Sequence, residues 1–318
     1  MSHEIELKFQ INQEDIANLQ AFLNQWASSD ELEFSSLSKK QRTFSTLSLA
    51  NSYYDTADNY LRNHHCGLRL RSTENNQTKQ YEMTLKRDSH AIAGLHERAE
   101  YNVDLSQPQL DLSLFPAQVF PKACDITTLQ QNLKPLFTTN FTRQVWLISF
   151  ANSEIEVALD QGEITSNGQT IPIQEVELEI KHGNKHDLLN FANELSRFHL
   201  HLFSQSKAAR GYRLLNNQKL SPTEFELTQQ SSLFDIIKYW QKNEEYALSI
   251  DNLDFYKRVL DQVNHQLMNK ADKFNPELTQ WQMALSAINT IKTFAFSEIN
   301  TTLKLMLIAQ IDNEVKNE

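Results

Sequence analysis

Apolar and charged residues alternate along six segments in the first 215 residues of the chain. Side chains two residues apart share one face of a β-strand, so each segment is predicted to be a strand with one apolar and one charged face. The charged faces carry Glu4, Glu6 and Lys8; Arg69 and Arg71; Glu82, Thr84 and Lys86; Arg98 and Glu100; Glu156 and Asp160; and Glu175, Glu177 and Glu179. With a few helical stretches, such as 15–26 and 185–198, this part is predicted to be α+β.

After residue 222 the apolar spacing becomes that of helices. Four amphipathic helices are predicted, around residues 233–240, 256–267, 278–288 and 303–311. All six glycines lie before residue 212, and six of the seven prolines lie before residue 223. The polar stretch 216–224 is therefore predicted to link a first domain, residues 1–215, to a small helical bundle, residues 225–318.

The charged faces leave two arrangements open. In one, a sheet covers a core with its apolar face and exposes its charges to water. In the other, the strands close into a barrel with a charged interior, and helices cover the apolar outside. A dry charged interior would be too costly, so such a barrel would have to be wet and hold compensating ions. The three carboxylates at 175, 177 and 179 repel one another, and a positive group is expected between them.

The barrel arrangement has a chemical implication. Carboxylates without neighbouring His or Cys are hard ligands that suit Mg²⁺ or Mn²⁺. Arginine and lysine on neighbouring strands suit phosphate oxygens. Further basic residues are Arg143, at the start of an apolar strand, and Lys207 and Arg210, close to Gly211. Metal and phosphate binding are the joint implication.

Composition limits the classes of function. Of the 318 residues 40% are hydrophobic, enough for a core, and the net charge of −10 argues against broad binding of nucleic acid or an anionic membrane. Without an 18-residue apolar run or a secretion signal, a cytoplasmic protein is expected. Cys66 and Cys124 suggest neither a disulfide framework nor a thiolate zinc site. The common phosphate-loop, dinucleotide, nucleophile-elbow and zinc-protease motifs are absent from the sequence.

Eight short motifs, in order, carry a family resemblance. They are EIELK, YYDTADNYL, GLRLR, YEMTLK, ERAEY, EVALDQG, VELEI and SKAARGYRL. Over roughly residues 1–215 the chain resembles the CYTH family, or triphosphate tunnel metalloenzymes, and within it the bacterial inorganic triphosphatases that carry a C-terminal helical CHAD domain. The resemblance implies a closed tunnel of eight antiparallel strands, in which basic side chains and divalent metals hold a linear triphosphate.

The resemblance also implies roles for individual residues. The implied metal ligands are Glu4, Glu6, Glu177 and Glu179, with Asp160 as a further acidic position near the metal. The implied phosphate-binding residues are Arg69, Arg71, Lys86, Arg98, Arg143, Lys207 and Arg210. Lys8 and Glu100 match positions linked to the reacting end of the substrate, and Glu82, Glu156 and Glu175 are further candidates for the tunnel lining.

The implied activity is hydrolysis of inorganic triphosphate to diphosphate and phosphate with Mg²⁺ or Mn²⁺. Alternatives on the same scaffold are an adenylate cyclase and a thiamine or nucleoside triphosphatase. An alternative of another class is a non-catalytic sensor of polyphosphate or nucleotides.

The region after residue 222 departs from the family pattern. It has 9 Lys and Arg against 14 Asp and Glu, a net charge of −5, whereas a CHAD domain is longer and carries basic motifs. A reduced bundle that packs on the tunnel or mediates self-association is therefore expected, rather than a polyphosphate-binding domain.

Overall fold

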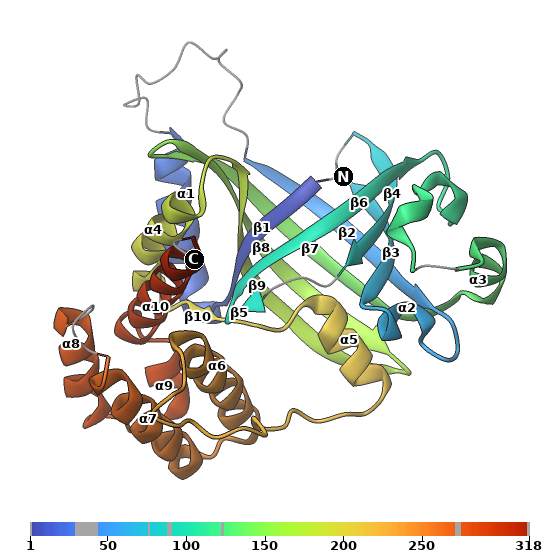
Figure 1. Ribbon diagram of the computed structural model, residues 1–318. Helices are drawn as coiled ribbons and strands as arrows, with labels where there is room; N and C mark the ends of the chain where they lie inside the picture. Colours follow the sequence, from blue (N-terminus) through green and yellow to red (C-terminus); the bar gives the residue numbers. More distant parts are fainter. Residues whose placement is uncertain are drawn as a thin grey trace.

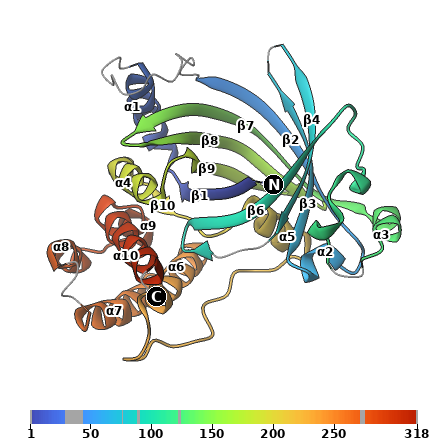
Figure 2. The ribbon, with the colours of Figure 1, turned by 45° about the horizontal axis from the view of Figure 1, so that its top comes forward.

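The structure is a computed structural model that describes residues 2–28, 44–75, 77–87, 91–121, 124–270 and 275–316. Its first part is a β-barrel with helices packed on the outside, and its last part is a group of helices beside the barrel (Figure 1 and Figure 2). No helix among the described residues is long and apolar enough to cross a membrane.

Eight long strands form the barrel. They are β1 (Ser2–Gln10), β2 (Ser45–Asp55), β3 (Cys66–Glu74), β4 (Lys79–Arg87), β6 (Leu95–Leu105), β7 (Lys134–Phe150), β8 (Ser153–Ser166) and β9 (Gln169–His182). Their order is β1-β9-β8-β7-β2-β3-β4-β6, and antiparallel pairing of β1 with β6 closes the barrel. The short strand β5 (Ala91–Ile92) pairs with β6, and the short strand β10 (His201–Leu202) pairs with β1. The predicted closed tunnel of eight antiparallel strands is confirmed.

The strand register places opposite charges beside one another inside the barrel. Glu4 on β1 lies opposite Arg98 on β6, and Arg143 on β7 lies opposite Asp160 on β8. On β1 and β9, for example, the other face points outward and is apolar, and Leu7 and Leu178 are buried under helices. The second of the two arrangements, with the charges inside, is therefore the one that forms.

Helices cover the outer apolar faces on two sides. On one side α1 (Ile16–Ser28) and α4 (Lys185–Leu195) pack on β1, β7, β8 and β9. On the other side α2 (Tyr60–Asn63) and α3 (Ile126–Asn132) share a core with β3 and β4. Short 3₁₀ turns lie at Gln13–Asp15, Leu112–Leu114, Ala117–Val119 and Ser196–Phe198.

The motif around Gly211 forms helix α5 (Lys207–Leu215). The helix begins at Ser206, whose hydroxyl oxygen accepts a hydrogen bond from the backbone N–H of Ala209. It lies so close to β7 that a Cβ atom at Gly211 would overlap the ring of Phe137. The absence of a side chain at Gly211 thus allows α5 to approach the barrel.

The chain then runs without helix or strand through residues 216–232 into five helices of the described region. These are α6 (Leu233–Ile250), α7 (Leu253–Met268), α8 (Asn275–Leu285), α9 (Ile291–Ala295) and α10 (Glu298–Lys316). The prediction of four helices is wrong, because it missed the short helix α9, which has only five residues. Trp240 of α6 and Leu307 of α10 belong to the same hydrophobic core as Leu195 of α4 and Leu178 of β9, so these helices pack on the outside of the tunnel.

Candidate active site

A cavity of about 600 Å³ occupies the interior of the barrel. All eight long strands and α5 contribute to its wall. The predicted site residues on this wall are Glu4, Glu6, Lys8, Arg69, Arg71, Lys86, Arg98, Glu100, Arg143, Glu177, Glu179 and Lys207, and the predicted lining candidates Glu82 and Glu156 also lie there. Asp160, Glu175 and Arg210 are buried beside the cavity; Asp160 and Glu175 form ion pairs with the wall residues Arg143 and Lys207, and Arg210 forms one with Glu175.

One cluster joins Glu4 and Glu6 to basic residues of β4 and β6. Arg98 Nε donates to Glu4 at 2.6 Å, and its Nη2 donates to Glu6 at 2.6 Å. Lys86 Nζ lies 3.0 Å from both carboxylate oxygens of Glu4. Burial alone would raise the pKa of Glu4, but the charges of Lys86 and Arg98 outweigh it and lower that pKa. Glu4 is therefore ionised at neutral pH.

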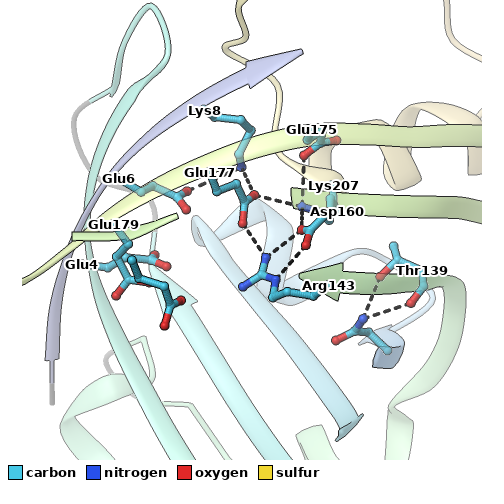
Figure 3. A network of polar contacts seen from close by, with 12 residues as sticks. Glu4, Glu6, Lys8, Thr139, Arg143, Asp160, Glu175, Glu177, Glu179 and Lys207 are labelled. Carbon is cyan, nitrogen blue, oxygen red and sulfur yellow. Dashed lines mark hydrogen bonds and ion pairs between the residues drawn. The ribbon is translucent and has the colours of Figure 1, made fainter. Parts of the chain in front are cut away.

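A second cluster surrounds Glu177, as Figure 3 shows. Its carboxylate lies 3.1 Å from Lys8 Nζ, 2.6 Å from Arg143 Nη2 and 2.9 Å from Lys207 Nζ. Arg143 also holds Asp160 through two hydrogen bonds of 2.7 Å. Burial would raise the pKa of Glu177, yet the three cations, Lys207 foremost, bring it well below its usual range. The positive groups expected between the carboxylates of β9 thus come from β1, β7 and α5.

The arginines of β3 have donors that the protein does not use. Arg71 Nε donates to the side-chain oxygen of Asn51 at 2.7 Å, and among the described residues Arg71 makes no ion pair with a carboxylate. Burial and repulsion from Arg69 and Arg143 lower the pKa of Arg71 to about 9. Arg69 bonds to Glu82 and Thr84, but its Nε is buried without a hydrogen-bond partner. Two neighbouring guanidinium groups with spare donors are what an anionic ligand requires.

The sequence and this charged tunnel match a known family. The CYTH domain model matches residues 2–212. The chain belongs to the CYTH family. The inorganic triphosphatase of Haemophilus influenzae is 31% identical over 287 residues, which cover 87% of this chain and 70% of that protein. Because the CYTH domain ends at residue 212, the similarity to this relative also includes part of the helical region.

Solved structures resemble the chain more loosely. A putative adenylyl cyclase from Hippeastrum, described as having a dominant triphosphatase activity, has a TM-score of 0.48 and 14% identity, covering 68% of this chain and 97% of its own. The PH1819 protein from Pyrococcus horikoshii has a TM-score of 0.43 and 16% identity, with coverage of 68% and 99%. At these scores the similarities say nothing about activity.

The CYTH family implies divalent metals, and the predicted ligands can be compared with that requirement. Among the residues that the structure describes, no three His, Cys, Asp or Glu side chains converge as a metal site does. Their chemistry nevertheless fits a hard cation, because Glu179 lies opposite Glu6 on one side and Glu156 on the other. Burial, and then repulsion from Glu4 and Glu156, raises the pKa of Glu179 although Lys181 bonds to it at 2.8 Å. Negative charge is thus incompletely neutralised in this part of the CYTH tunnel.

The two candidate catalytic residues have different surroundings in the CYTH tunnel. The side chain of Lys8 is 2% exposed and lies 3.5 Å from Glu6 and 3.1 Å from Glu177. Burial acts to lower the pKa of Lys8, but Glu177 and Glu6 outweigh it and raise that pKa. Glu100 lies 3.2 Å from Lys86 and 3.8 Å from Arg69. Lys8 is thus a fixed positive charge, whereas Glu100 is an acceptor beside the phosphate-binding candidates.

Several wall residues of the CYTH tunnel were not predicted. They include Tyr53, Arg62, His65, Asn102 and Lys181. Lys181 continues the inward face of Glu175, Glu177 and Glu179, so the spacing of that strand could have revealed it. Tyr53 and the buried Asn51 belong to β2, where the same alternating positions from Leu47 to Tyr53 carry no charge and therefore give no comparable signal.

Proposed function

We propose that this CYTH tunnel is a metal-dependent inorganic triphosphatase, which hydrolyses tripolyphosphate to diphosphate and phosphate with Mg²⁺ or Mn²⁺. The observation that carries the proposal is the pair Arg69 and Arg71, whose guanidinium groups have unused donors inside the charged cavity of the barrel. Such a pair suits a small polyanion with several oxygens. The similarity to an inorganic triphosphatase supports the same substrate.

Phosphate oxygens would bind first where no carboxylate competes, which is at Arg71. The other proposed phosphate ligands, Arg69, Lys86, Arg98, Arg143 and Lys207, already bond to carboxylates, so a triphosphate would share them or replace those contacts. Arg210 bonds to Glu175 and to the backbone oxygen of Pro172. Arg210 does not line the cavity, so it would influence the phosphate through its charge and through Glu175, which also bonds to Lys207. Binding would therefore exchange internal ion pairs for phosphate contacts.

Glu4, Glu6, Glu177 and Glu179, with Asp160 nearby, would hold the metal. When bound, Mg²⁺ or Mn²⁺ would neutralise phosphate oxygens and lower the pKa of a bound water. The carboxylates of Glu4, Glu6 and Glu177 are ionised in the protein because their pKa values are lowered by neighbouring cations that outweigh the effect of burial. They are therefore available to a cation without first losing a proton.

Phosphoryl transfer to water demands mainly positioning and charge stabilisation from the protein. Lys8 would stabilise negative charge on the reacting phosphate, since its raised pKa keeps the ammonium protonated. An ammonium cannot accept a proton from water, so we assign the orientation of the attacking water to Glu100. The water oxygen would bond to the terminal phosphorus as the anhydride oxygen leaves with diphosphate, and one proton of the water would pass to the carboxylate of Glu100 and then to solvent.

Phosphate release tests the proposal. Tripolyphosphate, ATP and thiamine triphosphate are compared with Mg²⁺, with Mn²⁺ and with EDTA. We expect tripolyphosphate to be hydrolysed fastest and EDTA to abolish the reaction. Faster formation of cyclic nucleotide from ATP would favour a cyclase, and tight tripolyphosphate binding without phosphate release would favour a sensor; either result contradicts the proposal.

A further inference from the structure

One short segment contacts both the tunnel wall and the helical region. Residues 201–206, here called the strap, begin with β10, which pairs with Phe9 and Gln10 of β1. The backbone N–H of Phe203 then donates to the carbonyl oxygen of Lys8 at 2.9 Å. The strap ends at Ser206, the N-cap of α5, and the next residue is Lys207. Any displacement of the strap would therefore be passed directly to Lys207.

Helix α6 holds the strap through side chains on one of its faces. Glu245 accepts a hydrogen bond from the backbone N–H of Ser204 at 2.7 Å and another from Gln205 Nε2 at 2.7 Å. Gln241 Nε2 donates to the carbonyl oxygen of Leu202 at 2.5 Å and to Glu245 at 2.8 Å. Both the backbone and a side chain of the strap are thus fixed to α6.

Glu245 is a buried carboxylate at the contact between α6 and the strap. It is 6% exposed, and among the described residues it forms no ion pair; three N–H groups bind its carboxylate instead. Hydrogen bonds to an ionised acceptor are stronger than those between neutral groups, and a buried carboxylate that lost them would be left unsatisfied. The strap is therefore held in one place with respect to α6.

The residues that follow the strap belong to the tunnel. Lys207 Nζ lies 2.7 Å from Asp160, 3.0 Å from Glu175 and 2.9 Å from Glu177. Arg210, one helical turn later, bonds to Glu175. The three contacts of Lys207 come from β8 and β9, and Lys207 is the first residue of α5, so these contacts depend on where the strap sets the start of that helix.

We propose that Glu245 is a positioning residue of the triphosphate site, which acts through the strap to keep Lys207 and Arg210 in place. The inference rests on the proposed function in treating these two residues as part of the phosphate-binding set. It gives the helical region a role in the tunnel that does not require it to bind polyphosphate.

The test compares Glu245→Ala and Glu245→Gln with the control Gln282→Ala. Gln282 bonds to Asn264 at 2.7 Å between α8 and α7, so the control removes a hydrogen bond of the helical region that does not involve the strap. Calorimetry gives the Kd for tripolyphosphate, and kinetics give kcat and KM. We expect Glu245→Ala to raise Kd and KM by about tenfold or more, Glu245→Gln by less, and Gln282→Ala to change neither.

A second comparison separates positioning from general loss of structure. In a Lys207→Met background, Glu245→Ala should have a smaller further effect on Kd than in the unaltered protein, because the contacts of Lys207 that the strap positions are already lost. Unchanged Kd and KM in folded Glu245→Ala, an equal loss in Gln282→Ala, or additive effects with Lys207→Met would overturn the inference. Should Glu245→Ala fail to fold, Glu245→Gln decides by the same criteria. If the unaltered protein binds tripolyphosphate but releases no phosphate, the proposed function fails, while the Kd comparison still judges the inference.

Discussion

The side-chain oxygen of Asn51 accepts a hydrogen bond from Arg71 Nε at 2.7 Å. Thr139 fixes this orientation, since Asn51 Nδ2 donates to its backbone oxygen at 2.9 Å and to its hydroxyl oxygen at 3.0 Å. The amide could not rotate by half a turn without losing all three bonds. A neutral acceptor thus holds a half-buried guanidinium group in position and leaves its charge for a ligand.

Replacement of Asn51 by Asp should weaken tripolyphosphate binding. The new carboxylate would form an ion pair with Arg71 and compete with phosphate, so we expect KM to rise about tenfold or more. The matched control is Asn140→Asp, which adds the same charge at an exposed position of β7. Steady-state phosphate release measures both variants, and an equal KM for the two would contradict this role of Asn51.

Arg71 and Arg143 should differ in what they contribute to stability. Arg71 has no ion pair among the described residues and its charge is opposed by burial, so Arg71→Met should abolish tripolyphosphate binding while the free energy of unfolding stays unchanged or rises. Arg143→Met should lower that free energy by about 3 kcal/mol, because Asp160 is 0% exposed and loses its bidentate partner. Urea unfolding and calorimetric binding check both, and a large loss of stability in Arg71→Met would be the contrary result.

Loss of a proposed metal ligand should remove turnover without unfolding the barrel. We expect Glu4→Gln or Glu6→Gln to lower kcat by about 100-fold or more, because several kcal/mol of metal charge stabilisation would be lost. Glu163→Gln, at an exposed position of β8, is the control and should keep its activity. Calorimetry with Mn²⁺ measures the metal affinity directly. Full metal-dependent activity in both tunnel variants would refute the ligand assignment.

The spacing of charged residues predicted most of the cavity wall, because the backbone of a strand fixes which side chains share a face. It could not predict the partners of those residues. Glu4 and Arg98 are 94 positions apart in the sequence, and they meet only because β1 pairs with β6. The predicted faces were therefore obtainable from local pattern, whereas the ion pairs depend on how the barrel closes.

Other features gave no local signal. Asn51 is a neutral residue between Ser, Leu and Ala neighbours in β2, and its importance depends on Arg71 in the neighbouring strand. Helix α9 has five residues, barely more than one turn, so its apolar residues could not display a helical period. The buried carboxylate of Glu245 sits in an amphipathic helix, where the sequence resembles that of an exposed polar face.

Glu244, the neighbour of Glu245, should make the helical region sensitive to acid. Its carboxylate is fully buried and accepts hydrogen bonds from His201, Lys304, Tyr256, Asn300 and Trp240. Burial would raise the pKa of Glu244, but the charge of Lys304, followed by the bond from His201, lowers it to about 2.

Because the folded pKa lies below the ordinary value of 4.5, ionised Glu244 stabilises the fold above about pH 4.5, and this contribution is lost as the pH falls towards about 2. The loss should amount to a few kcal/mol in order of magnitude. Urea unfolding at a series of pH values should therefore show a steep decline of the free energy of unfolding between about pH 4.5 and pH 2.

The variant Glu244→Gln should be less stable at pH 7, since Lys304 would be left buried without its anion. Its decline in stability on acidification should be shallower. Glu224→Gln, at an exposed position, should keep the original slope, and an equally steep decline in Glu244→Gln would show that other groups cause the acid sensitivity.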